Sequence, residues 1–211
     1  MKNFVLSSLI LFVLTSCSVN NYHYFQQQNN IQSKDSLGCI LCNDSSSTVY
    51  QAGIKIYGKY YSGLFVFKKM SVDTERIAFI NEMGIVFFNL EFASDTFKVL
   101  QAIPQFNRKS IFQILKQDFS MILLKNLTSN YLAFDNPKEN EKMYKYKDGN
   151  TTINYIINKS NNKILSIERT GKCFKKVIIS IENDTSLSPK RIIIHHKNVN
   201  LKIDLKRLEK L

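Results

Sequence analysis

Residues that form recognisable catalytic sites are scarce in this sequence. Its 211 residues include only seven glycines and three histidines. There is no Gly-rich phosphate-binding loop, no G-x-S-x-G nucleophile motif and no H-E-x-x-H zinc-protease motif. The 17 acidic residues are dispersed along the chain, so their spacing indicates no carboxylate pair for acid–base catalysis. We therefore expect a protein that is not an enzyme and that uses no cofactor or metal.

Cysteine and histidine offer few complete sets of metal ligands. Cys39 and Cys42 have C-x-x-C spacing, but the sequence lacks a second C-x-x-C and the opening of a helix that makes such thiols reactive. His195 and His196 are adjacent in a strand-like run, so they point to opposite faces and cannot easily share one metal. A zinc site, a disulfide from Cys173 to Cys39 or Cys42, and buried thiols are the alternatives.

The sequence also lacks a hydrophobic run long enough to cross a bilayer. The apolar run over residues 4–14 follows Lys2 and is about half of the roughly 20 residues that a spanning helix needs. It ends in Leu14-Thr15-Ser16-Cys17, which resembles the lipobox of bacterial lipoproteins. We therefore expect residues 1–16 to be a signal peptide and Cys17 to be lipidated.

This resemblance implies a membrane anchor. A lipobox cysteine typically carries three acyl chains, and each buried methylene contributes about 0.8 kcal/mol. Ser18 follows Cys17 without an acidic run, which by the same resemblance favours the outer membrane, facing the periplasm. Residues 17–36 are rich in Asn, Gln and Ser and are expected to form a lipidated tether. Residues 37–211 are expected to form a single β domain.

Dense blocks of arginine with interleaved aromatic residues are absent, although the net charge is +12. The lysines are scattered through predicted strands and turns, so we expect no nucleic-acid partner. Two interpretations of the charge remain, solvated strand faces with lysines at the sheet edges and attraction to anionic lipid head groups.

Alternation of apolar and polar residues with period two dominates the chain after residue 48. Short alternating runs separated by turn residues predict an antiparallel meander of about eleven strands. Asp148-Gly149, between two such runs, is a hairpin signal. The expected strands are 49–59, 60–69, 76–81, 85–92, 96–100, 142–147, 151–158, 163–168, 175–182, 191–197 and 199–205.

One segment, 110–124, has helical periodicity instead. Its apolar stripe must be covered, and a curved sheet is what the flanking strands supply. Ser110 and Gln113 have the spacing of a capping box. The stripe consists of Ile111, Leu115, Phe119 and Ile122.

The order of these elements, with the pattern R-x-x-F-x-N-x-x-G-x-x-F-F at residues 76–88, resembles the LolA/LolB-like lipoprotein-localisation family. The resemblance implies an unclosed antiparallel half-barrel with a helical lid over an apolar hollow. With a lipobox, it implies the membrane-anchored acceptor rather than the soluble carrier. The acceptor's protruding apolar loop would correspond here to residues 69–73, with Met70 or Val72 facing the membrane.

Fifteen Phe, ten Tyr and no Trp predict an aromatic-rich interior in which bulky rings leave room for a ligand. The expected function is to bind acyl chains there, accepting or inserting lipoproteins at the outer membrane and receiving them from a periplasmic carrier protein. Plain core packing is the alternative for each residue. The alternative function is a non-enzymatic envelope assembly or interaction lipoprotein that uses a basic sheet face. The candidate cavity residues are Phe65, Phe67, Phe79, Phe87, Phe92, Ile111, Leu115 and Phe119.

Overall fold

The computed structural model describes residues 22, 24–27, 37–41, 47–94, 96–125, 127, 131–171 and 175–208. The predicted signal peptide, the lipidation site Cys17 and two further cysteines, Cys42 and Cys173, lie outside the described residues. Within the described ranges, no helix is long and apolar enough to cross a membrane. The same ranges contain no cluster of three or more side chains suited to hold a metal ion.

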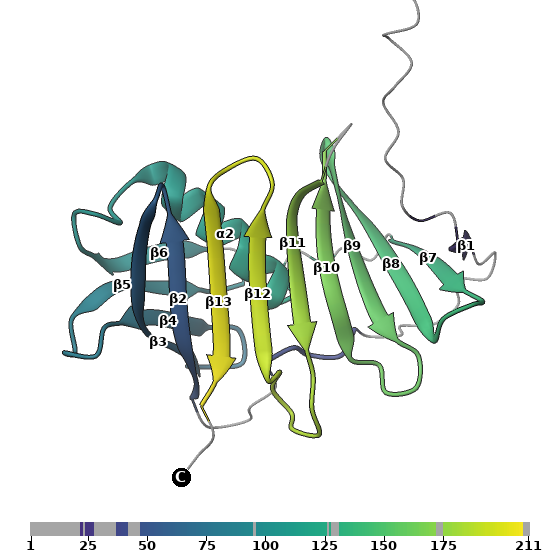
Figure 1. Cartoon of the computed structure of the whole chain (residues 1–211), viewed down its shortest axis with the longest axis horizontal. Coiled ribbons are helices and arrows are strands. Elements are labelled where there is room, and N and C mark those ends of the chain that lie inside the picture. Colours follow the sequence, from purple (N-terminus) through teal and green to yellow (C-terminus); the bar gives the residue numbers. More distant parts are fainter. Residues whose placement is uncertain are drawn as a thin grey trace, which may run out of the picture.

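The described chain forms one antiparallel sheet of thirteen strands in the order β1-β7-β8-β9-β10-β11-β12-β13-β2-β3-β4-β5-β6 (Figure 1). β1 and β6 are its two edges, so the sheet does not close. The strands are β1 (Gln26–Gln27), β2 (Thr48–Ile56), β3 (Lys59–Lys69), β4 (Glu75–Ile80), β5 (Val86–Phe92), β6 (Phe97–Ala102), β7 (Tyr131–Asn136), β8 (Glu141–Asp148), β9 (Thr151–Asn158), β10 (Ile164–Thr170), β11 (Lys175–Glu182), β12 (Arg191–His196) and β13 (Leu201–Arg207).

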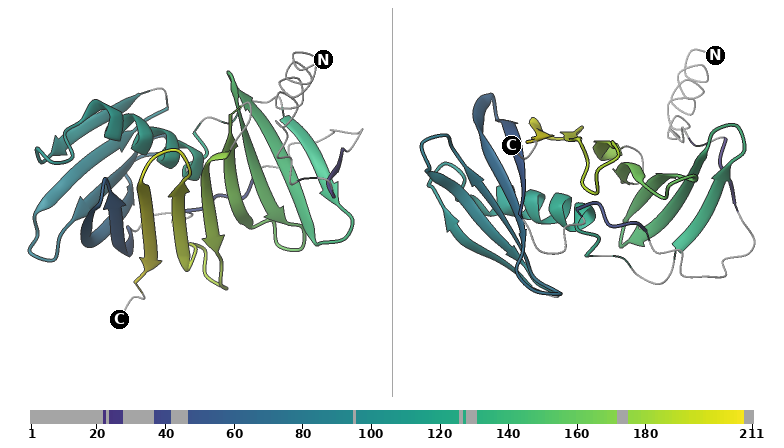
Figure 2. Two further views of the ribbon diagram at one scale, coloured as in Figure 1. Left: turned by 45° about the horizontal axis from the view of Figure 1, so that its top comes forward. Right: turned by 90° about the horizontal axis from the view of Figure 1, so that it is seen from below.

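The sheet curves around a helix, α2 (Lys109–Ile122), which lies on its concave side (Figure 2). Two meanders, β2–β6 and β7–β13, are joined through α2, and β13 then pairs with β2. The predicted unclosed half-barrel with a helix over its hollow face is therefore confirmed. Two of the thirteen strands, β1 and β7, were not among the expected ones.

Alternation along each strand determines which side chains face α2. In β2, Tyr50, Ala52 and Ile54 are buried on the concave side, whereas Gln51 and Lys55 are exposed on the outer side. The same period recurs in β13, where Leu201, Ile203 and Leu205 are buried and the residues between them are polar. The core thus lies between the concave face and α2, and the outward positions of these two strands are mostly polar.

A glycine allows the close approach of β3 and β4. Gly63 pairs with Ala52 of β2, and a Cβ at Gly63 would lie 2.2 Å from the backbone oxygen of Ile80. Because that neighbour is backbone and cannot rotate away, a larger residue would force the two strands apart.

The helix begins slightly earlier than predicted. Its N-cap is Arg108, which makes no side-chain cap hydrogen bond, so the predicted capping box at Ser110 and Gln113 is wrong. Ser110 is the second residue inside the helix, where its hydroxyl cannot take the N-cap position. At the other end, Leu124 adopts a left-handed conformation with φ of 56°, and the Lys125 N–H donates to the Ser120 carbonyl at 2.9 Å, as at many helix ends.

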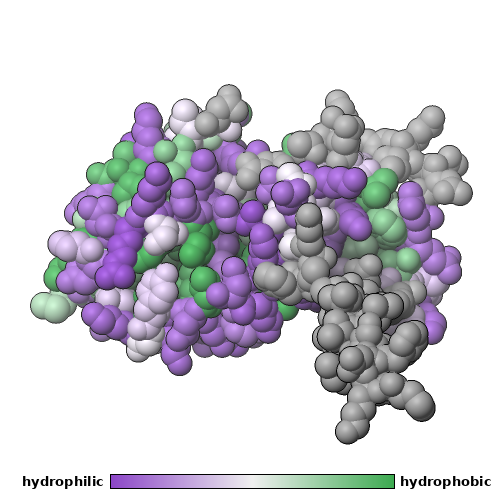
Figure 3. All heavy atoms as spheres, turned by 90° about the horizontal axis from the view of Figure 1, so that it is seen from above, coloured by the Kyte–Doolittle hydropathy of each residue, from purple (hydrophilic) through white to green (hydrophobic). Residues whose placement is uncertain are grey.

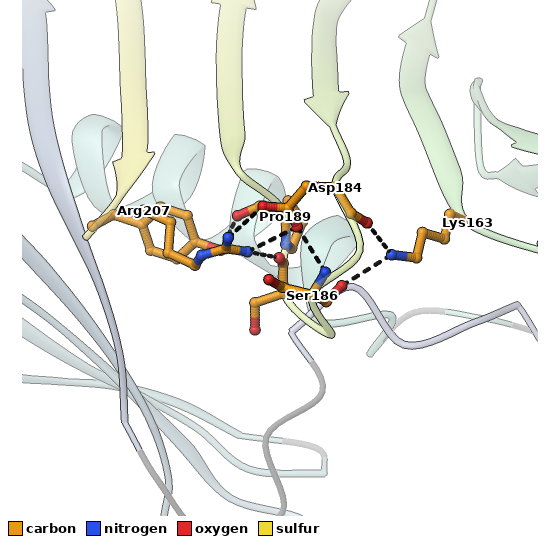
Figure 4. Close-up of polar contacts among 7 residues, drawn as sticks. Lys163, Asp184, Ser186, Pro189 and Arg207 are labelled. Carbon is orange, nitrogen blue, oxygen red and sulfur yellow. Dashed lines mark hydrogen bonds and ion pairs between the residues drawn. The ribbon is translucent and has the colours of Figure 1, made fainter. Parts of the chain in front are cut away.

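Polar contacts hold the loop between β11 and β12 at the lower ends of these strands (Figure 4). Arg207 of β13 pairs with Asp184 and donates to the carbonyl of Ser188. Its hydrogen bonds hold the pKa of Asp184 at about 2. Lys163 Nζ donates to the carbonyls of Asp184 and Ser186 at 2.6 and 2.9 Å. The loop therefore fixes the start of β12, the strand that leads to His196.

Candidate functional site

The space between α2 and the concave face of the sheet is where the sequence predicts a hydrocarbon-binding site. Most of the helix residues that face the sheet are apolar, because their spacing follows the helical period. The buried helix residues are Ile111, Phe112, Leu115, Asp118, Phe119, Ser120, Met121 and Ile122. The interface is thus a hydrophobic surface with one acidic group in it.

Aromatic rings from three strands meet the helix in one cluster. The ring centroids of Phe65 and Phe79 lie 4.9 Å apart, and Phe119 of α2 lies 5.6 Å from Phe65 and 5.9 Å from Phe67. Phe92 also contacts Phe119, at 6.4 Å between centroids. Such edge and offset contacts each add to the stabilisation that burial provides. The rings fill the space beneath this part of α2.

All eight predicted cavity residues contribute to this interior. Phe65, Phe67, Phe79, Phe92, Ile111, Leu115 and Phe119 are buried, and Phe87 is half-buried against the core. The structure therefore places all eight residues in, or against, one packed apolar core that α2 and the sheet share.

Two further rings belong to the cluster and were not predicted. Phe88 is fully buried and lies 5.6 Å from Phe65. Counting back from Phe92 with period two gives residues 90 and 88, so the alternation of β5 itself identifies Phe88. Phe106 comes from the segment between β6 and α2 and contacts both Phe87 and Phe88. No periodicity extends over that segment, so nothing in the sequence singles out Phe106.

A buried histidine–carboxylate contact joins the helix to the centre of the sheet. His196 Nε2 lies 2.8 Å from Asp118 Oδ2, and the Asp118 side chain is only 1% exposed. Burial raises the pKa of Asp118, and the hydrogen bond and charge of His196 oppose that shift. His195, the next residue, is exposed on the outer face, as strand alternation predicts. The pair is a buried polar contact in a largely apolar interface.

Other polar contacts hold the ends of α2. Tyr155 of β9 donates its hydroxyl to the Met121 carbonyl at 3.2 Å, and Arg169 of β10 hydrogen-bonds Gln117. Beyond the helix, Lys125 Nζ lies 2.7 Å from Glu75 Oε2 and donates to the Asp73 carbonyl at 2.9 Å. The helix is therefore attached to both halves of the sheet by a few separate polar contacts.

The predicted membrane-facing loop is the turn between β3 and β4, and Lys125 reaches it from the end of α2. Met70 is 44% exposed and Val72 is 83% exposed, so both apolar side chains face solvent. The Met70 N–H donates to the Thr74 carbonyl at 2.8 Å, which closes the turn. The loop thus presents apolar side chains and is tied to the helix through one lysine.

Hollows that the described residues line are found on the outer face of the sheet. One, of about 310 Å³, lies beside Tyr22, Phe25, Met143 and Asn154. Another, of about 990 Å³, lies over β2, β3, β12 and β13. None of the eight predicted cavity residues lines either hollow.

Part of the predicted tether lies against the sheet. Gln26 and Gln27 pair with β7, and the Tyr22 hydroxyl contacts Glu168 and accepts a hydrogen bond from Asn154 Nδ2 at 3.1 Å. The Lys175 ammonium lies 5.4 Å from the centroid of the Tyr22 ring. These contacts fix Tyr22 to the outer side of the β7–β10 half and Gln26–Gln27 to its edge.

No protein-family model and no curated protein matches this chain. A LolA superfamily protein from Nitrosomonas europaea is similar in structure, with 10% identity and a TM-score of 0.48, over 82% of this chain and 91% of that one. A DUF1329 family protein from Desulfovibrio piger has 9% identity and a TM-score of 0.42, over 79% of this chain and 85% of that one. The architecture of this chain, an unclosed antiparallel sheet with a helix on its concave face, is the one that the sequence predicted.

Proposed function

We propose that this protein is a non-enzymatic, lipid-anchored carrier that shelters acyl chains between α2 and the concave face of its sheet. The observation that carries the proposal is the almost wholly apolar interface of α2 with an unclosed sheet, held by few polar contacts. Hydrocarbon is stabilised by about 25 cal/mol for each Å² removed from water. Passing a chain from one apolar surface to another needs no covalent bond to form or break.

Movement of α2 is the step that admits the ligand. Because aromatic rings fill the closed interface, an acyl chain replaces contacts between helix and sheet instead of entering an empty space. The apparent affinity is then the intrinsic affinity multiplied by the fraction of molecules in the open state. Contacts that keep α2 closed therefore weaken binding.

The specific role we propose resembles that of the LolB-like acceptor, which receives lipoproteins from a periplasmic carrier and inserts them into the outer membrane. Exposed Met70 and Val72 would enter the membrane, and Lys125 would transmit that contact to α2. Seen from above, hydrophobic residues lie among hydrophilic ones over the half where β5, β6 and α2 lie (Figure 3). Val99 and Leu100 of β6 are exposed apolar side chains of that half.

The anchor follows from acylation of Cys17, and the contacts of Tyr22 restrict its reach. Five residues span at most about 18 Å, so the lipid would lie close to the outer side of the β7–β10 half. We expect the Cys17→Ala variant to move from the membrane fraction to the soluble fraction and to lose incorporation of labelled palmitate. Cys39→Ala is the matched control and should keep both properties. Equal palmitate incorporation in wild type and Cys17→Ala would contradict the anchor.

The lid is tested by removing one contact that keeps it closed. Tyr155→Phe deletes the hydroxyl that donates to the Met121 carbonyl, a bond worth about 0.5–1.5 kcal/mol. That carbonyl keeps the Leu124 N–H as a donor at 3.3 Å, so no acceptor is left without a partner. We expect the variant to bind a fluorescent fatty acid about 2–10-fold more tightly than wild type.

Tyr57→Phe, at an exposed position in the β2–β3 turn, is the matched control and should leave the affinity unchanged. Binding would be measured by titration with a dansylated fatty acid. Unchanged or weaker binding by Tyr155→Phe would show that α2 does not limit access.

A further inference from the structure

The larger hollow on the outer face is a site separate from the α2 interface. Its volume is about 990 Å³, at the upper end of the range for small-molecule sites. The side chains that line it come from the outward positions of β2, β3, β12 and β13 and from the segments that flank them. They include Lys55, Lys190, Arg191, Lys202 and Lys206 as cations and Glu82, Glu182 and Asp204 as anions.

Strand register places two lysines of this hollow directly opposite each other. Lys202 of β13 pairs with Lys55 of β2, and directly opposed side chains have Cβ atoms about 4.5–5.5 Å apart. Like charges in such a pair are destabilising in the empty sheet. Their juxtaposition is therefore better suited to holding an anion than to stabilising the fold.

The acidic residues of the hollow form no close ion pair with these lysines, although the charge of Lys202 contributes to lowering the pKa of Asp204. Asp204 is occupied by Arg191, whose Nε and second terminal nitrogen lie 2.8 and 2.6 Å from its two oxygens. Glu182 lies 3.7 Å from the same arginine. Among the described residues, no carboxylate lies within ion-pair distance of the Nζ atoms of Lys55, Lys190, Lys202 or Lys206.

The same row of residues extends to His195 on one side and to an aromatic ring on the other. His195 pairs with Lys202, and its pKa is lowered by burial and by the positive charges of Lys197 and Lys202. Tyr60 pairs with Lys55 and is 70% exposed. The row therefore combines excess positive charge with an accessible ring.

Small residues form the floor next to Tyr60. Gly53 and Ser62 are paired across β2 and β3, and a Cβ at Gly53 would lie 2.5 Å from the Tyr60 hydroxyl. The ring therefore lies down over the glycine and leaves its other face open. A flat ring beside hydrogen-bonding groups suits the apolar face of a sugar, whereas a planar bilayer would contact protruding side chains and not a recessed floor.

We propose that this hollow binds an acidic oligosaccharide, with one anionic group between Lys55 and Lys202 and a sugar ring against Tyr60. The lysines supply charge attraction, and the Tyr60 ring, which lies over Gly53, supplies an exposed flat face for the sugar. Ser62 and Gln51 of the lining are in place to hydrogen-bond sugar hydroxyls. This binding is independent of acyl-chain binding, which uses the opposite face of the sheet.

Titration of the purified full-length protein in detergent with a galacturonic acid hexamer tests the proposal, with neutral maltohexaose as the uncharged comparison. The variants are the double substitution Lys55→Gln/Lys202→Gln and the single substitution Tyr60→Ala. The matched control, Lys68→Gln/Lys69→Gln, also removes two charges, from exposed positions of β3 outside the hollow. Circular dichroism would verify that each variant is folded.

We expect saturable binding of the acidic hexamer, little binding of maltohexaose, and an affinity at least 10-fold weaker in Lys55→Gln/Lys202→Gln. The control should stay within about 2-fold of wild type, and Tyr60→Ala should weaken binding about 3–10-fold. If the control variant bound the hexamer as weakly as Lys55→Gln/Lys202→Gln, the loss of net charge alone would explain the effect. The proposal would then be overturned. It would also be overturned if the hexamer did not bind, or if phosphatidylglycerol vesicles alone showed the dependence on Lys55 and Lys202.

Discussion

Replacing His196 with leucine is expected to lower the free energy of unfolding by about 3–5 kcal/mol at neutral pH. The Asp118 carboxylate is almost fully buried and lies 2.8 Å from His196 Nε2. Leucine would leave that carboxylate in an apolar interface without its partner, and an unpaired buried charge is strongly destabilising. Urea unfolding followed by circular dichroism would measure the loss.

The loss should depend on pH in a defined direction. Burial raises the pKa of Asp118 in the folded state, so ionisation is penalised in the folded protein and not in the unfolded chain. That penalty grows as pH rises from the ordinary carboxyl value, about 3.9, through the raised folded value. The deficit of His196→Leu relative to wild type should therefore shrink as pH falls toward about 4.

A double substitution separates the ion pair from other effects of the site. Replacing both Asp118 and His196 with leucine removes the charge together with its partner, so the stability should return to within about 1–2 kcal/mol of wild type. If the double variant were as unstable as the sum of the two single variants, packing and not the buried charge would explain the loss.

Replacing Phe65 with alanine is expected to lower the free energy of unfolding by about 3–5 kcal/mol. Phe65 is fully buried, and its ring contacts Phe79, Phe88 and Phe119. Alanine would leave a cavity at the centre of the interface between helix and sheet, where neighbouring rings cannot collapse completely. This loss is a large fraction of the 5–15 kcal/mol typical of a domain.

The next residue of the same strand provides the control. Val66 points to the outer side of β3 and is half-buried, so Val66→Ala should cost no more than about 1 kcal/mol. Both variants would be measured by urea unfolding under one set of conditions. Similar losses at both positions would contradict the concave core described here.

Much of the architecture could be predicted from the sequence because period-two alternation identifies the buried face of each strand. β2 shows this in Tyr50, Ala52 and Ile54, which alternate with outward residues and are all buried. The helix was identified by its 3.6-residue period. Its start was misplaced, because Arg108, which makes no side-chain cap bond, is the N-cap.

The strands that could not be predicted lack that periodic signal. β1 is two glutamines that pair through backbone groups only, so no side-chain pattern marks it. In β7, the buried positions are Ala133 and Asn136. They are three residues apart, so they do not follow the two-residue period of a strand. Both strands therefore form because they pair with neighbouring strands of the sheet.

The polar features of the molecule depend on contacts between residues far apart in the sequence. Asp118 and His196 are 78 positions apart, and only the placement of α2 across the sheet brings them together. Lys55 and Lys202 meet because β13 pairs with β2. From composition alone, the high positive charge could be explained either by solvated strand faces or by attraction to anionic lipid head groups. The strand register is what locates the lysine pair.

The absence of tryptophan from the chain allows a direct measurement of where hydrocarbon binds. The Phe87→Trp variant would place a single fluorophore at the half-buried edge of the aromatic cluster, beside Phe79, and Tyr60→Trp would place one on the outer face. A brominated fatty acid, which quenches tryptophan on contact, should quench the first variant strongly and leave the second nearly unchanged. Equal quenching of both, or none in Phe87→Trp, would contradict an acyl-chain site beneath α2.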